Sequence, residues 1–241
     1  MKVYLNSIDG IADAITTMYM SKRSWTREKE EHIREVVEKC TKRNGFIYDE
    51  QDKETYEEFT DMLNKLFKWG KIHNTMLRFI DLSVTVEGLH RGATDDFDSH
   101  AKRLENRIIR SSTRLATYET EEISEWYQNK IVPTNVMLAY LGIETPDEIN
   151  YGGNTYVKGT NGYIKKGFEN NNDVKRGLYM LSLPMNFIFK VNLIEFAHIM
   201  KERDKNSHAN PELQMMIESL YEQINKQYKW ITREFLYDIK N

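Results

Sequence analysis

The segment that most constrains the fold of this chain is residues 176–208, which is strongly apolar but carries polar side chains at long intervals. Three of these are Arg176, Asn192 and Arg203. Asn192 and Arg203 are 11 residues apart, which is close to three turns of a continuous helix, so the spacing predicts one shared helical face. A buried, unpaired guanidinium is costly, so Arg203 must meet either a carboxylate at the helix end or an anionic ligand. The spacing alone leaves both interpretations open.

Length and composition indicate a single domain over residues 1–241. The chain has 241 residues and 40% hydrophobic content, which is enough for a full core. It has no run of about 18 apolar residues and no basic-then-apolar N-terminal pattern, so we expect a cytoplasmic protein with no membrane partner. The net charge of −3 argues against a surface built as a whole for nucleic acid, and nucleic acid is not an expected partner.

The single cysteine, Cys40, limits the chemistry that the chain can perform. One cysteine excludes an internal disulfide and a multi-cysteine metal site, and no metal site is expected. Cys40 recurs with Ile33, Val36 and Val37 at helical spacing. We therefore place it on the core face of a helix rather than at an exposed position where a thiolate could act as a nucleophile.

Periodic patterns predict elements along the whole chain. Alternation predicts strands in residues 2–7 and 80–87. Helical spacing and capping signals predict helices in residues 10–21, 27–44, 53–69, 120–131 and 134–141, with another that begins at residue 211. Thr26 is the expected N-cap of the second helix and Gly45 its expected stop. Residues 90–98 read as a loop, and a hairpin insertion is expected at about 150–170.

A row of arginines marks the middle of the chain. Residues 96–118 read as a helix, on which Arg103, Arg107, Arg110 and Arg114 would line one face. Four guanidinium groups in a row repel one another unless an anion lies among them, and arginine is well suited to bind phosphate. The alternative is a solvated basic face with intermittent ion pairs.

The apolar run resembles the C-terminal signature of the flavin-dependent thymidylate synthases, the ThyX family. That signature has an Arg, a Leu-Pro pair, a Val-Asn pair, a helix that ends in an Arg, and a short Asp/Ser/His-Ala-Gln-x-Glu-Ile run. The corresponding residues are Arg176, Leu183-Pro184, Val191-Asn192, Arg203 and Ser207-His208-Ala209-Asn210-Pro211-Glu212-Leu213, in which Asn210 replaces the family's Gln. The spacing of Arg176, Asn192 and Arg203 is that of the family.

Two shorter segments resemble other ThyX motifs. Ser112-Thr113-Arg114 is similar to the family's Ser-x-Arg, which holds the phosphate of dUMP, whereas Lys102-Arg103-Leu104 replaces its flavin-binding Arg-His-Arg. His73 and Thr75 match a His-x-Thr element that lies against the flavin in that family. The nucleotide half of the signature is thus retained and the flavin half is altered.

The resemblance implies an α+β fold of the ThyX type, with a central antiparallel sheet flanked by helices and an added β-hairpin. It implies an enzyme that methylates dUMP, or a related pyrimidine nucleotide, to dTMP. FAD is the implied cofactor, with NADPH and 5,10-methylenetetrahydrofolate as co-substrates. The implied assembly is a homotetramer with sites shared between subunits.

The resemblance also assigns roles to individual residues. Arg203 matches the catalytic residue that holds the pyrimidine edge. The implied substrate-binding residues are Arg110, Ser112, Arg114, Arg176 and Arg203. The implied cofactor-binding residues are His73, Thr75, Arg103, Asn192 and His208.

Three alternatives remain open at this point. The same site could hydroxymethylate dUMP or dCMP. The chain could also be a non-catalytic binder of nucleotides or nucleic acid that uses the arginine row as a phosphate track. The last alternative is a scaffold with a decayed site.

Overall fold

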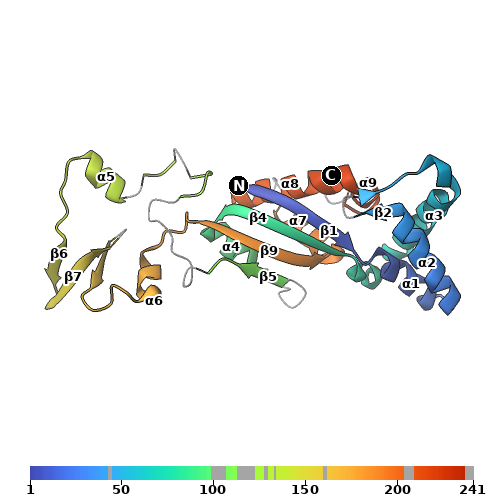
Figure 1. Ribbon diagram of the computed structural model, residues 1–241, viewed down its shortest axis with the longest axis horizontal. Helices are drawn as coiled ribbons and strands as arrows, with labels where there is room; N and C mark the ends of the chain where they lie inside the picture. The colour runs from blue at the N-terminus through green and yellow to red at the C-terminus, as the bar shows by residue number, and fades with distance from the viewer. Residues whose placement is uncertain are drawn as a thin grey trace. The chain divides into compact units, whose positions relative to one another are not determined.

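The computed structural model describes residues 1–42, 45–98, 107–112, 123–127, 130–132, 134–159, 162–203 and 209–236, without the side chains of Gln51, Arg107, Ile108, Asn172, Asp173 and Arg176. The chain divides into two compact units. The helical unit comprises residues 3–86, 98–109 and 188–241, and the hairpin unit comprises residues 1–2, 87–97 and 110–187. Figure 1 labels most of the helices and strands of both units.

A four-stranded sheet has the order β1-β4-β9-β5. Its strands are β1 (Lys2–Asp9), β4 (Asp81–His90), β5 (Arg107–Arg110) and β9 (Pro184–Asn192). Buried and less buried positions alternate along β4 and β9, as expected for strands with one face on a core. Asp81 pairs with Lys190 at 3.2 Å, and the Gly88 amide donates to Asn186 Oδ1 at 3.0 Å. β4 and β9 are therefore antiparallel.

Three packed helices begin the helical unit, namely α1 (Ile11–Ser21), α2 (Arg27–Cys40) and α3 (Lys53–Gly70). The Thr26 hydroxyl accepts a hydrogen bond from the Lys29 amide, which confirms the predicted N-cap. The predicted stop at Gly45 is wrong, because α2 ends at Cys40 and short strands follow, β2 (Thr41–Lys42) paired with β3 (Gly45–Phe46). The 3₁₀ turn η1 (Glu50–Asp52) leads into α3.

Gly10 sets how α1 begins against the 3₁₀ helix η2 (Asn74–Phe79). Its φ is +82°, in the left-handed region that favours glycine. A Cβ at this position would lie 1.8 Å from the carbonyl oxygen of Phe79. The close approach of these two backbones therefore requires a glycine.

The C-terminal helices of the same unit are α7 (Leu193–Arg203), α8 (Pro211–Gln227), α9 (Lys229–Ile231) and the π-helical η4 (Thr232–Leu236). Asn210 Oδ1 accepts from the Glu212 amide, which confirms the predicted start of α8. Gln223 of α8 accepts from the Leu5 amide and donates to the Val3 carbonyl oxygen, both at 2.8 Å. The side chain thereby satisfies backbone groups of the edge strand β1, which would otherwise lack sheet partners.

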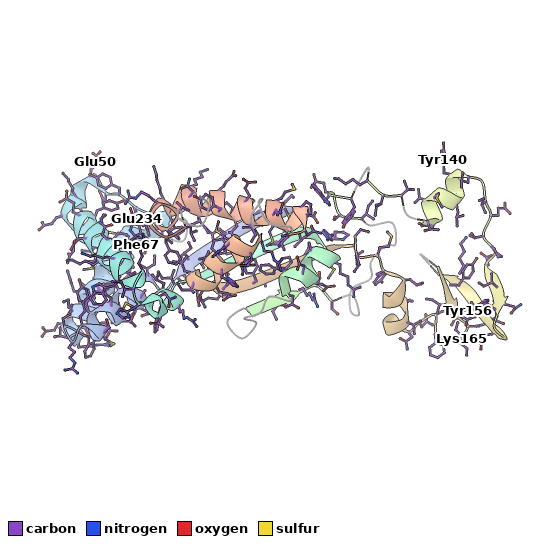
Figure 2. The ribbon with its side chains drawn as sticks, turned by 180° about the vertical axis from the view of Figure 1, so that it is seen from behind. Glu50, Phe67, Tyr140, Tyr156, Lys165 and Glu234 are labelled. Atoms are coloured by element: carbon purple, nitrogen blue, oxygen red, sulfur yellow. The ribbon has the colours of Figure 1, made fainter. Side chains whose placement is uncertain are left out.

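The hairpin unit contains a three-stranded antiparallel sheet of β6 (Glu148–Tyr151), β7 (Asn154–Gly159) and β8 (Gly162–Lys165). This confirms the predicted hairpin and adds a third strand to it. Tyr156 and Lys165, labelled in Figure 2, are register partners across β7 and β8. The other elements are α4 (Arg91–Asp98), α5 (Thr134–Tyr140), α6 (Asn172–Lys175) and η3 (Arg176–Leu178).

Predictions for three further segments of the described residues are wrong. Residues 91–98 form the helix α4 and not a loop, because Ala93, Thr94 and Phe97 share a buried face that the polar composition conceals. Residues 107–110 form the strand β5 and not part of a helix, since pairing with β9 overrides the helical spacing of the arginines. Residues 125–127 form a turn and not a helix.

The described residues contain no helix long and apolar enough to span a membrane.

Candidate functional site

An ion-pair cluster brings β5 and α4 together in the hairpin unit. Arg110, the last residue of β5, donates through Nη1 to Asp95 Oδ1. Arg91 Nε of α4 lies 3.8 Å from Asp95 Oδ2. Because Arg110 and Asp95 are each about two-fifths exposed (40% and 44%), the pair is solvent-screened and adds little stability. Arg110 and Arg91 are therefore gathered beside the same carboxylate, that of Asp95.

Asn186 of β9 fixes the residue that precedes Ser112. The Ser111 amide donates to the Asn186 carbonyl oxygen at 2.8 Å. The Ser111 hydroxyl donates to the same oxygen at 3.0 Å and accepts from the Asn186 amide at 3.1 Å. The Asn186 side chain accepts from the Gly88 amide at 3.0 Å, so one residue connects β4, β9 and the end of β5. Ser112 follows this junction and is half-buried.

The start of α4 is held by backbone hydrogen bonds to residues 181 and 183 and by a buried histidine. The Arg91 amide donates to the Leu183 carbonyl oxygen at 2.8 Å, and the Gly92 amide donates to the Leu181 carbonyl oxygen at 3.0 Å. His90 is 1% exposed, and its ring meets that of Tyr127 edge-on, with centroids 4.9 Å apart. These contacts position Arg91 next to Asp95.

His73 and Thr75 lie in the helical unit, just before and at the start of η2, which follows α3. Both residues are exposed. The His73 ring stacks on Trp69, with centroids 5.5 Å apart and planes inclined by 16°. The His-x-Thr element is thus an exposed turn, held by this aromatic stack and by the His73 amide, which donates to the Trp69 carbonyl oxygen at 2.7 Å.

Asn192 ends β9 and caps α7. Its Oδ1 accepts from the Glu195 amide at 2.9 Å, and the residue is 7% exposed. The Leu193 amide donates to the Ile80 carbonyl oxygen at 2.8 Å, which joins the start of α7 to the end of η2. Asn192 therefore caps the helix that packs against η2, the 3₁₀ helix that His73 precedes and that contains Thr75.

Asn192 and Arg203 do not share one helical face, so that prediction is wrong. Asn192 lies before α7 in the strand β9, and Arg203 is the last residue of the helix, half-buried. Alternating burial of Met185, Phe187 and Phe189 makes this part of the apolar run a strand. The two residues therefore stand at opposite ends of α7.

The predicted site residues are distributed over both units. Arg110 and Ser112 belong to the hairpin unit. Four others belong to the helical unit, namely His73, Thr75, Asn192 and Arg203. Arg176 begins η3 in the hairpin unit, and its side chain is not among those described. Arg103, Arg114 and His208 lie outside the described residues.

Sequence reasoning missed Arg91, Asp95 and Asn186. Arg91 directly follows a strong strand, a place where binding side chains are often found, and this signal was available. Asn186 is a polar residue in an apolar run, on the less buried side of the alternation. Asp95 gives no local signal, because its partner Arg110 comes from the strand β5.

Cys40 is on the core face of α2, as predicted. It is 4% exposed, and its thiol lies 3.8 Å from the Thr55 carbonyl oxygen. Burial raises the pKa of the thiol, and the nearby Asp52 raises it further. The only cysteine of the chain is therefore neither accessible nor activated as a nucleophile.

The described residues contain no group of three or more His, Cys, Asp or Glu side chains arranged to hold a metal ion.

The chain has an α+β fold of the ThyX type, which its likeness to solved structures shows. One similar structure is ThyX from Helicobacter pylori with FAD and dUMP, at 13% identity and a TM-score of 0.54, covering 100% of both chains. A second, flavin-dependent thymidylate synthase ThyX from Helicobacter pylori complexed with FAD and dUMP, has 12% identity and a TM-score of 0.52, covering 96% of this chain and 97% of that one. No protein-family model matches the sequence, and no curated protein matches it significantly. The likeness establishes the fold.

Proposed function

We propose that this protein is a flavin-dependent thymidylate synthase-like enzyme that methylates dUMP to dTMP. 5,10-Methylenetetrahydrofolate is the proposed carbon donor, reduced FAD the hydride source and NADPH the reductant of the flavin. The observation that carries the proposal is the fold likeness over the full length of both chains to a structure that holds FAD and dUMP. The spacing of Arg176, Asn192 and Arg203 supports it independently, because that spacing is a property of the sequence alone and matches the family signature.

The state of Cys40 favours the flavin-dependent reaction over the cysteine-dependent one. A thymidylate synthase that adds a thiolate to the pyrimidine needs an accessible cysteine of lowered pKa. Cys40 is 4% exposed, and burial raises the pKa of its thiol. Activation of the ring must then come from positive charge rather than from a covalent bond.

In this proposal the arginines bind and polarise the nucleotide. Arg203 holds the pyrimidine edge, where its guanidinium stabilises negative charge that develops on the ring. Ser112, Arg110, Arg114 and Arg176 bind the phosphate. The two groups come from different subunits of a homotetramer.

The described cofactor residues have side chains suited to a flavin. The imidazole of His73 and the hydroxyl of Thr75 are exposed on one turn and can contact a planar, hydrogen-bonding ring. Asn192 adds an amide on the adjoining element, and Arg103 and His208 complete the set. When bound, the flavin would supply the hydride that reduces the transferred carbon to a methyl group.

The first test is the colour of the purified protein. The proposal expects flavin absorbance as isolated or after reconstitution with FAD, and a tetramer by light scattering. Colourless protein that cannot be reconstituted would remove the flavin enzyme from consideration.

The second test is product formation from dUMP, NADPH and the folate. Mass spectrometry separates dTMP from hydroxymethylated dUMP or dCMP, the alternative products. Arg203→Ala is expected to lower kcat by about 10²-fold or more, as for loss of other charge-stabilising groups. Arg233→Ala, which removes an exposed arginine paired with Glu234, is the matched control and should leave activity unchanged.

A further inference from the structure

A basic patch lies on the three-helix part of the helical unit and includes none of the proposed active-site residues. It consists of Lys22 at the C-cap of α1, Lys29 in the first turn of α2, and Lys65 and Lys68 near the end of α3. Lys22, Lys65 and Lys68 are exposed, and Lys29 is half-buried. The mutual packing of α1, α2 and α3 brings these four positions together from sites up to 46 residues apart.

Two of the four ammonium groups lie over aromatic rings. Lys22 Nζ is 4.4 Å from the ring centroid of Trp69, and Lys29 Nζ is 3.8 Å from that of Tyr19. Lys29 Nζ also donates to the Ser24 carbonyl oxygen at 3.3 Å. These contacts hold the two flexible side chains in place, so the charges are arranged before a ligand arrives.

The charge of the basic patch is largely unneutralised. Lys65 forms an ion pair with Asp61. No carboxylate of the described residues pairs with Lys22, Lys29 or Lys68. The pKa of Lys22 is lowered, first by burial and then by repulsion from Lys65, Lys68 and Lys29. Positive charge is therefore concentrated here in a chain whose net charge is −3.

We propose that the basic patch binds single-stranded nucleic acid, with the lysines on the phosphate backbone. A ligand that contacts all four ammonium groups must carry several negative charges along its length, as a phosphate backbone does. Single-stranded nucleic acid also offers bases that stack on aromatic side chains. Trp25, 39% exposed at the connection between α1 and α2, is such a side chain.

An anionic membrane surface is the competing ligand, and the two aromatic rings that contact the lysines do not favour it. Apolar side chains that enter a bilayer must project beyond the lysines that contact the headgroups. Tyr19 and Trp69 instead lie beneath the ammonium groups of Lys29 and Lys22. The proposal departs from the sequence-based expectation that nucleic acid is not a partner, because the net charge of −3 describes the whole chain and not this local patch.

The test is fluorescence anisotropy of the full-length protein with a labelled single-stranded DNA of about 20 nucleotides, and with RNA of the same length. With roughly 0.7 counterions released per phosphate contact, four contacts predict a log–log salt slope of about −3. Affinity should then fall on the order of 50-fold between 50 and 200 mM salt. Lys22→Glu combined with Lys68→Glu should weaken binding by about tenfold or more at low salt.

A charge-matched double variant distinguishes binding at the basic patch from a general effect of net charge. Lys39→Glu combined with Lys53→Glu makes the same change of net charge at exposed positions on α2 and α3 outside the patch, and it should retain most of the affinity. Equal loss in both double variants would overturn the proposal, as would the absence of oligonucleotide binding at 50 mM salt. Binding to vesicles with 30% anionic lipid but not to oligonucleotide would overturn it in favour of a membrane. Circular dichroism and melting temperatures check that both double variants are folded.

Discussion

Asp95 accepts a hydrogen bond from Arg110, so a carboxylate of α4 occupies one of the guanidinium groups that the proposed function assigns to phosphate binding. The same carboxylate lies 3.8 Å from Arg91 Nε. Asp95 thereby holds the two arginines near each other and also competes with any anion that would bind them. This dual role makes Asp95 a sensitive position at which to test the site.

Asp95→Asn should strengthen phosphate binding at little cost in stability. The substitution removes the competing negative charge but keeps the size of the side chain. Because the ion pair is exposed, the free energy of unfolding should change by less than about 1 kcal/mol. The affinity for dUMP, measured by isothermal titration calorimetry, should rise a few-fold.

Glu57→Gln is the control for that experiment, because Glu57 forms an exposed ion pair with Lys53 on α3. It should change neither dUMP affinity nor stability appreciably. A fall in dUMP affinity in Asp95→Asn would contradict the view that Asp95 competes with the phosphate.

Two substitutions of Asn192 should distinguish its role as the N-cap of α7 from its proposed role in FAD binding. Asn192→Ala removes the N-cap of α7 and should lower the free energy of unfolding by about 1 kcal/mol. Asn192→Ser keeps an oxygen that can cap the helix and should retain most of that stability. Both variants lose the amide, so FAD affinity should fall in both.

Urea unfolding and FAD titration monitored by absorbance measure these two quantities. If FAD affinity follows stability and is restored in Asn192→Ser, Asn192 acts only as a helix cap.

Gly10→Ala should destabilise the helical unit strongly. The new Cβ would lie 1.8 Å from the Phe79 carbonyl oxygen, and the backbone would remain at a φ of +82°. We expect a loss of about 2 kcal/mol or more in the free energy of unfolding. Gly152→Ala has a similar φ of +56° with no atom within 4 Å of the new Cβ, so it should cost only the backbone strain. Thermal melts of both variants give the comparison, and equal losses would show that the contact with Phe79 is unimportant.

Stability should decline at alkaline pH because of Tyr228. Its side chain is 1% exposed and donates to the Lys42 carbonyl oxygen at 3.2 Å, and burial raises the pKa of the phenol. The unfolded chain then releases this proton at a lower pH than the folded chain does. The buried neutral phenol therefore contributes its full stabilisation below about pH 9. This contribution is lost as the pH rises through the ordinary tyrosine pKa near 10 and then through the raised pKa of the phenol in the folded chain.

Tyr228→Phe should show a smaller drop in melting temperature between pH 8 and pH 11 than the unsubstituted protein. Cys40, whose pKa is also raised by burial, accounts for part of the drop that remains. Tyr140→Phe removes a phenol that is 89% exposed and should leave the drop unaltered. An identical pH profile in Tyr228→Phe would show that this phenol does not contribute.

Elements with one buried face were predictable from the sequence. The alternation in β4 and the apolar stripe of α8 match the residues that are buried, and the N-caps Thr26 and Asn210 make the expected hydrogen bonds. Cys40 follows the same rule. In each case the pattern shows which side of one helix or strand is buried. The residues of that element alone are enough to predict it.

What the sequence by itself determined was therefore the set of amphipathic elements and the long spacing of Arg176, Asn192 and Arg203. The tertiary structure decided that Arg110 is in a strand beside β9, that Asp95 pairs with it, and that Asn192 caps α7 instead of sharing its face. These outcomes depend on partners distant in sequence. Strand pairs and ion pairs of this kind form only after the chain has brought separate segments together. The spacing of residues within one segment therefore does not predict them.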